Sequence, residues 1–300
     1  MPIWEGVYRS SSEEKRLIKD HPESAQTSIH LAYLAGSITA LLFLPRNYHN
    51  NNGDAFRHCL WSSLIAKEIT PDWARLWTMA HEMDASLENK YRQMDEFNNL
   101  QGIHLLNNNS SLSSVKLIRR CFDLVETGSL KEIKSGKLVP TTIDGHNLPS
   151  IFNAISEKVT EVVEFLAHYY SEFTQEIDGD GNSALHRCIL NDYQDGFSIL
   201  IIILDVNEIG ADGLSPIMQC SLQRHGHKYA RALLEQGANT DYQDPFKGET
   251  ALMLAARYGN SKMLDNLLPV ANKGLKSLSG LRAYDMAVSE ENMEIAKRLL

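Results

Sequence analysis

The sequence predicts an all-α protein, with an N-terminal helical domain followed by a solenoid of stacked helix pairs. In the second half, glycines at 181, 213, 248 and 280 open similar segments at intervals of 32, 35 and 32 residues. In the first half, apolar residues recur at helical spacing between polar breaks. A period of about 33 residues is typical of stacked repeats, because each unit alone leaves one apolar face uncovered.

The second half resembles ankyrin repeats in the residues that begin and end each helix pair. Ser183, Ser215 and Thr250 follow the repeat glycines at the expected start of a first helix, where a hydroxyl bonds locally. Paired leucines at 233–234 and 267–268 end second helices. The match is strongest for the units at Gly213 and Gly248. Repeats of this family bind proteins and carry no chemistry of their own.

The repeats in the second half and the different pattern of the first half predict two domains. We expect a helical, catalytic domain over residues 1–140 and about four to five ankyrin repeats over residues 141–300. Gly145 lies 36 residues before Gly181 and begins a degenerate first repeat. The sequence stops at Leu300 without a polar capping repeat, which predicts that the last repeat is truncated.

Composition excludes several classes of partner. The net charge of -9 and pI near 5.7 argue against binding to nucleic acid or to an anionic membrane surface. The most apolar stretch, Ile29 to Leu44, is about 16 residues long, whereas a membrane-spanning helix needs about 20. We therefore expect no membrane-spanning segment.

The chain has four cysteines and no C-x-x-C pair, which predicts free thiols.

Capping residues place the helices of the first domain. A serine cap with acids in the first turn begins a helix at Ser10 to Glu14, and Thr70 with Pro71 begins another. The remaining helices are expected from Ala25 to before Pro45, from Asp54 to Ile69, and over Val115 to Val125 with Gly128 as C-cap.

Three polar clusters in this domain are candidates for chemistry. They are Asn52 to Trp61, Ala80 to Glu82, and Met94 to Gly102. Asp54 and His58 are four residues apart, so both face one side of a helix and the carboxylate can orient the imidazole. Cys59 lies about 100° further round the same helix.

Together, these clusters resemble a small helical domain of unknown function found widely in bacterial secreted proteins. The resemblance covers about residues 10 to 141 and also includes Glu13 to Pro22 and Leu138 to Thr141. It marks ten positions: Asp54, Arg57, His58, Trp61, His81, Glu82, Asp95, Asn98, Asn99 and Gly102. Fusion of such a domain to ankyrin repeats resembles effectors that intracellular bacteria of the Legionella type inject into host cells. It implies virulence, secretion into the host cytoplasm and a host protein as the partner of the repeats.

Our first hypothesis for the site is a thiol hydrolase similar to cysteine proteases. Cys59 would be the nucleophile, His81 the general base and Asp95 the group that orients it. The order Cys, His, Asp and the local Cys-x-Trp resemble papain-type enzymes. The supporting residues are Asp54, His58, Glu82, Asn98 and Asn99. This mechanism requires no cofactor and no metal.

Two alternatives stay open. A metal-dependent hydrolase would use His58, His81 and Asp95 as ligands and Glu82 as the base acting on bound water. In a non-catalytic protein, the same side chains form a buried polar network, Cys59 is an ordinary packed cysteine, and the chain is a scaffold that binds a host protein.

Overall fold

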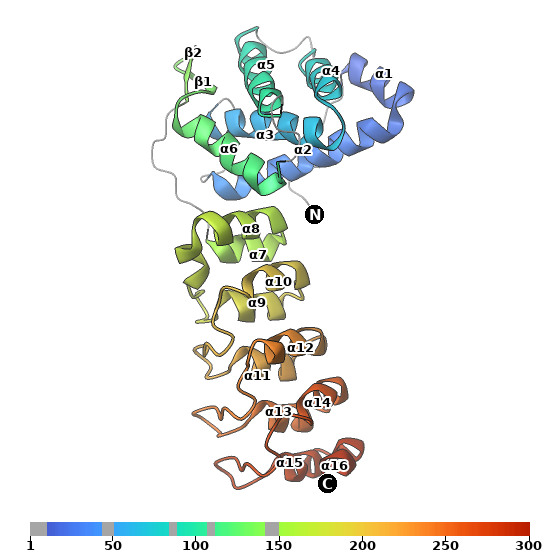
Figure 1. Ribbon diagram of the computed structural model, residues 1–300, viewed down its shortest axis with the longest axis vertical. Helices are drawn as coiled ribbons and strands as arrows, with labels where there is room; N and C mark the ends of the chain where they lie inside the picture. The colour runs from blue at the N-terminus through green and yellow to red at the C-terminus, as the bar shows by residue number, and fades with distance from the viewer. Residues whose placement is uncertain (1–10, 44–50, 84–88, 107–111, 142–149) are drawn as a thin grey trace. The chain divides into compact units, whose positions relative to one another are not determined.

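The computed structural model describes residues 11–43, 51–83, 89–106, 112–141 and 150–300 (Figure 1). The chain divides into two compact units, residues 1–149 and 150–300. The predicted domain boundary, at about residue 140, falls at the end of the last strand of the first unit. Gly145, the expected start of a degenerate repeat, lies outside the described residues.

The first unit contains six described helices and one hairpin. They are α1 (Ser12–Asp20), α2 (Pro22–Leu42), α3 (Asn52–Glu68), α4 (Pro71–His81), α5 (Asn89–His104), α6 (Ser114–Glu126), β1 (Lys131–Lys134) and β2 (Lys137–Pro140). The predicted caps are confirmed. Ser11 and Glu14 form a capping box at α1, and the Thr70 hydroxyl accepts from the backbone N–H of Trp73 at α4.

Helix α3 is the central helix of this unit and packs against α2, α4, α5 and α6 (Figure 1). It is buried on nearly all sides, from Gly53 to Ala66, so its polar side chains must find partners within the protein. Its contact with α5 is close at Gly102, where an added Cβ would lie 2.0 Å from the Cys59 carbonyl oxygen. Only glycine allows the two backbones to approach this far.

The first unit is mostly helical, as predicted, and also contains a short hairpin of β1 and β2. The strands pair antiparallel, with Lys134 opposite Lys137. Ser135 and Gly136 between them have φ values of 51° and 75°, as a tight hairpin turn with two left-handed residues requires. Each strand has four residues, and an alternation of apolar and polar residues over so short a stretch does not by itself indicate a strand.

The second unit is a stack of five helix pairs, so the predicted solenoid fold is confirmed (Figure 1). In order, its helices are α7 (Ile151–Glu157), α8 (Thr160–Tyr169), η1 (Ser171–Gln175), α9 (Ala184–Leu190), α10 (Gln194–Leu200), α11 (Pro216–Leu222), α12 (His227–Glu235), α13 (Ala251–Arg257), α14 (Ser261–Leu267), α15 (Ala283–Ser289) and α16 (Met293–Leu299).

The glycines that set the sequence period share one backbone conformation. Gly181, Gly213, Gly248 and Gly280 have φ values of 78°, 78°, 65° and 78°, in the left-handed region that favours glycine. Each lies in the turn segment before a first helix. These segments are joined by backbone hydrogen bonds, from Ala211 N–H to the Gly181 carbonyl (3.0 Å) and from Leu278 N–H to the Lys247 carbonyl (2.9 Å). The period therefore reflects a turn that recurs with each repeat.

The hydroxyls at the starts of the first helices differ in their roles. Thr250 accepts from the Met253 N–H, as predicted. Ser183 instead lies 2.8 Å from His186 Nδ1, and Ser215 makes no side-chain cap bond. His186 Nε2 lies 3.0 Å from the Leu214 carbonyl oxygen, so this histidine joins neighbouring repeats through the backbone.

None of the described helices has the length and apolar character needed to cross a membrane.

Replacing Gly102 with alanine is expected to destabilise the protein by about 3 kcal/mol or to prevent folding, because the new Cβ overlaps the α3 backbone. Chemical denaturation measures the change in free energy of unfolding. Gly179→Ala is the control, since a Cβ there meets nothing within 4 Å. Equal effects of the two substitutions would contradict the close approach of α3 and α5.

Burial lowers the pKa of His186 below its ordinary value of 6.5. The unfolded chain therefore takes up a proton at this residue as the pH falls below about 6.5, while the folded repeats do not. We therefore expect the free energy of unfolding to decrease as the pH is lowered through this range. An NMR titration of the His186 ring in the folded protein measures the pKa directly, and a midpoint at or above 6.5 would show the prediction to be wrong.

Candidate functional site

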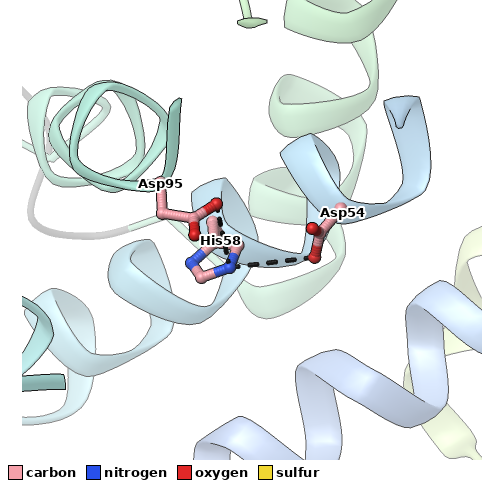
Figure 2. A group of neighbouring side chains, drawn as sticks. All are labelled: Asp54, His58 and Asp95. Atoms are coloured by element: carbon pink, nitrogen blue, oxygen red, sulfur yellow. Dashed lines mark ion pairs between the residues drawn. The ribbon is translucent and has the colours of Figure 1, made fainter. Parts of the chain in front are cut away.

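The three polar clusters of the first unit meet around His58. Its Nε2 lies 3.3 Å from Asp95 Oδ1 and 3.7 Å from Asp54 Oδ1 (Figure 2). Asp54 and His58 come from successive turns of α3, as their spacing predicted, whereas Asp95 reaches in from α5. All three side chains are buried. The contact between α3 and α5 thus brings together residues that are far apart in sequence.

Glu82 and Asn99 lie on the other side of the imidazole. Glu82, at the C-terminal end of α4, places Oε1 3.6 Å from His58 Nδ1. Asn99 of α5 donates from Nδ2 to the same oxygen at 3.4 Å. Both side chains are buried. The second and third clusters therefore contribute to one site.

Arg57 connects this group to the surface. It donates to Asp54 Oδ1 from Nε (3.1 Å) and Nη2 (2.6 Å), and Nη2 also lies 2.6 Å from His58 Nε2. Since a guanidinium can only donate, Nε2 is the acceptor and the proton of a neutral His58 lies on Nδ1, toward Glu82. The Arg57 side chain is 25% exposed, so it borders on solvent.

The electrostatic environment is unusual for a protein interior. Burial, together with the nearby Arg57, lowers the pKa of His58 well below its usual range. Burial and the neighbouring carboxylates of Glu82 and Asp54 raise the pKa of Asp95 well above its usual range. Burial also raises the pKa of Glu82 to about 6. Three carboxyl groups thus lie near one guanidinium. Clusters of ionisable groups with shifted pKa values are typical of functional sites.

Several polar atoms in this group have no hydrogen-bond partner among the described residues. They are His58 Nδ1, Asp95 Oδ1 and Asn99 Oδ1. A buried polar atom without a partner costs about 1–3 kcal/mol. The site is therefore not a fully satisfied structural network within the part of the chain that the structure describes.

The structure does not place Cys59 with the other predicted catalytic residues. Its Sγ lies 3.4 Å from Cys121 Sγ of α6, and the side chain is fully buried. Burial and the neighbouring Cys121 raise the pKa of the Cys59 thiol. His58 and Cys59 project about 100° apart on α3, so the two face different helices. This arrangement does not support Cys59 as a nucleophile.

His81 pairs with a residue that sequence analysis did not select. Its Nδ1 lies 2.9 Å from Oε1 of Glu14, which is fully buried on α1. The capping box identifies Glu14 as a helix-start residue, and nothing in the sequence connects α1 with the end of α4. His81 also packs edge-on against Trp61, with ring centroids 5.0 Å apart. These contacts do not bring it into the group of Asp54, His58 and Asp95.

Asn98 connects α5 to the hairpin. Its amide donates from Nδ2 to the Lys131 carbonyl and accepts from the Lys131 N–H, both at 2.9 Å. These paired bonds fix β1 against α5. Asn98 thus holds the hairpin, whereas its neighbour Asn99 faces the site.

Comparison with known proteins supports the division of the chain. Residues 15–129 match the family described as "Domain of unknown function (DUF6973)". Residues 199–277 and 217–300 match the family described as "Ankyrin repeats (3 copies)". The C-terminal part consists of ankyrin repeats.

A curated mouse protein, "Ankyrin repeat and SAM domain-containing protein 6" from Mus musculus, is 32% identical to this chain over 97 residues. The match covers 31% of this chain and 11% of that relative. Ankyrin repeats suggest binding to proteins. Neither match names a reaction for the DUF6973 domain.

The geometry of the DUF6973 domain fits proton transfer or metal binding better than thiol chemistry. A neutral imidazole with carboxylates on both sides can accept and pass on a proton. Nitrogen and carboxylate oxygen atoms are also the ligands that zinc and manganese take. The candidate site therefore consists of Asp54, Arg57, His58, Glu82, Asp95 and Asn99.

All four cysteines are buried, and burial raises the pKa of Cys59, Cys188 and Cys220. We expect the native protein to react with a thiol reagent such as DTNB very slowly at pH 8, because thiolate is the reactive form. The same protein in guanidinium should release four equivalents of chromophore. Rapid labelling of Cys59 in the native state would contradict its burial and revive the thiol hypothesis.

Proposed function

We propose that this protein binds a protein partner through the tips of the turns in its ankyrin repeats. The observation that carries the proposal is a recurring exposed apolar residue in the segments that connect successive helix pairs. These tip residues are Ile177, Ile209, Phe246 and Leu278. Phe246 is 67% exposed and Leu278 75% exposed. These residues are 32, 37 and 32 positions apart, one in each turn segment, and apolar side chains this exposed are typical of a surface that a partner covers.

The stacking of the repeats explains how four separate residues form one surface. Backbone hydrogen bonds join neighbouring turns, so the tips follow one another at the spacing of the repeats. Aromatic and large aliphatic side chains at the centre of an interface carry most of its binding energy. The tips therefore supply the affinity, and the polar residues around them supply the specificity.

We further propose that the partner is a host protein and that the chain is a bacterial effector secreted into the host cytoplasm. The support is the resemblance of the first domain to secreted bacterial proteins and its fusion to ankyrin repeats. In this setting the repeats bring the DUF6973 domain to its target. A scaffold that binds the host protein without turnover is the non-catalytic alternative.

A second proposed activity is hydrolysis by the DUF6973 domain, with His58 rather than Cys59 at the reacting centre. The favouring observation is the buried set of carboxyl groups around His58, with atoms that lack hydrogen-bond partners among the described residues. His58 would act as general base, Glu82 would orient it through Nδ1, and Arg57 would stabilise developing negative charge.

Replacing both Phe246 and Leu278 with serine is expected to weaken partner binding at least about tenfold, since large apolar side chains at an interface centre are worth about 1.4 kcal/mol or more. Quantitative mass spectrometry of proteins retained from host-cell extract by the full chain measures the loss. Ile202→Ser with Val270→Ser is the matched control, because these residues are also exposed but follow the second helices α10 and α14, away from the turns before the first helices. Equal retention by both variants would contradict binding at the tips.

His58→Gln is expected to abolish hydrolysis of ester or phosphodiester substrates and any toxicity on expression in host cells, while Cys59→Ala retains both. The physical reason is that His58 lies among the carboxyl groups and Cys59 packs against Cys121. Circular dichroism confirms that both variants are folded. Loss of activity in Cys59→Ala with retention in His58→Gln would restore the thiol mechanism.

A further inference from the structure

We propose that Asp54, His58 and Asp95 bind one divalent metal ion of the zinc or manganese type. The three residues differ from the ligand set that the sequence suggested, since Asp54 takes the place of His81. One ligand atom from each lies within 4.8 Å of the others. The three side chains converge from two helices on a single point (Figure 2).

The separations of the ligand atoms fit a common metal ion. Zinc takes nitrogen and carboxylate oxygen ligands at about 2.0–2.2 Å in tetrahedral geometry, so neighbouring ligand atoms are about 3.3–3.6 Å apart. Here His58 Nε2 is 3.3 Å from Asp95 Oδ1 and 3.7 Å from Asp54 Oδ1. Small side-chain shifts would complete the coordination without moving either helix.

The direction of the lone pairs gives an independent argument. Nε2 of His58 accepts from Arg57, so it carries no proton that it could donate to Asp95 Oδ1, and its one lone pair becomes available to a metal when Arg57 turns away. Asp95 Oδ1 is itself without a hydrogen-bond partner among the described residues, and Asp95 is only 8% exposed. Two acceptors that face each other at 3.3 Å need a cation or a proton between them. A metal ion satisfies both atoms at once.

The charge of the site also favours binding of a cation. Asp54, Glu82 and Asp95 bring three carboxyl groups into the interior, and Arg57 supplies one positive charge. Metal binding requires Asp95 to lose its proton, and a divalent ion would then neutralise the remaining negative charge. The Arg57 guanidinium now lies between Asp54 and His58, and because its side chain is 25% exposed, it can turn outward to make room.

The surroundings of His58 match those of a metal-bound imidazole. Ligating histidines almost always donate their other ring N–H to a carboxylate or carbonyl, which fixes the ring. His58 Nδ1 faces Glu82 Oε1 at 3.6 Å, just beyond hydrogen-bond distance, and Asn99 Nδ2 donates to that oxygen at 3.4 Å. Glu82 and Asn99 are therefore positioning residues for the metal ligand.

The inference concerns metal binding and is independent of the proposed partner. With a metal on Nε2, His58 would be a ligand and not the general base, so a bound ion would replace that role in the proposed hydrolysis. The test uses the full chain, freed of metal by chelator and dialysed. Isothermal titration calorimetry with Zn²⁺ and with Mn²⁺ is expected to show one tight site, and saturation should raise the melting temperature. Asp95→Asn should weaken binding at least about tenfold, a loss of the size seen when a metal site is disturbed.

Glu96→Gln is the matched control, because it makes the same carboxylate-to-amide change one residue away, where Glu96 pairs with Arg92. It should bind metal as the wild type does. If Asp95→Asn does not fold, His58→Gln replaces it with the same readout. The proposal is overturned if neither ion binds the wild type, or if the ligand variants bind as tightly as the control. In that case a proton on Asp95 bridges the two acceptors.

Discussion

The first unit depends on the close contact of α3 and α5 at Gly102. A side chain there would collide with the backbone at Cys59, so the two helices could not approach. Asp95 and Asn99 lie seven and three residues before Gly102, on the same face of α5. The contact that allows the helices to pack therefore also carries Asp95 and Asn99 to His58. Packing and the candidate site rest on one constraint.

The contact of α3 and α5 also places charged groups in the interior of a small domain. Burying carboxylates without compensation is unfavourable, and here the compensation is incomplete, because Arg57 is the one guanidinium beside three carboxyl groups in the described site. A network kept only for stability would be expected to satisfy its atoms. Among the described residues, His58 Nδ1, Asp95 Oδ1 and Asn99 Oδ1 instead have no hydrogen-bond partner.

The second unit is stabilised by a different principle, in which the same local contacts recur from repeat to repeat. A glycine with positive φ makes each turn, and backbone bonds join one turn to the next. His186 adds a side-chain link between repeats. The contacts inside the stack stabilise the fold, whereas the side chains of Phe246 and Leu278 in the turns are exposed and take little part in it.

The sequence by itself determined the helical class, the repeats, the helix starts at Ser11 and Thr70, and the pairing of Asp54 with His58. All of these depend on neighbours along the chain, through helical spacing, capping or the conformation of glycine. It did not reveal the hairpin turn at Ser135, the bond between Glu14 and His81, or the direction of Cys59. Only the tertiary structure decided that His58 meets α5 while Cys59 meets α6, because adjacent residues on a buried helix face different partners. Which polar residues form a site is set by helix packing, and one sequence does not encode that packing in any local pattern.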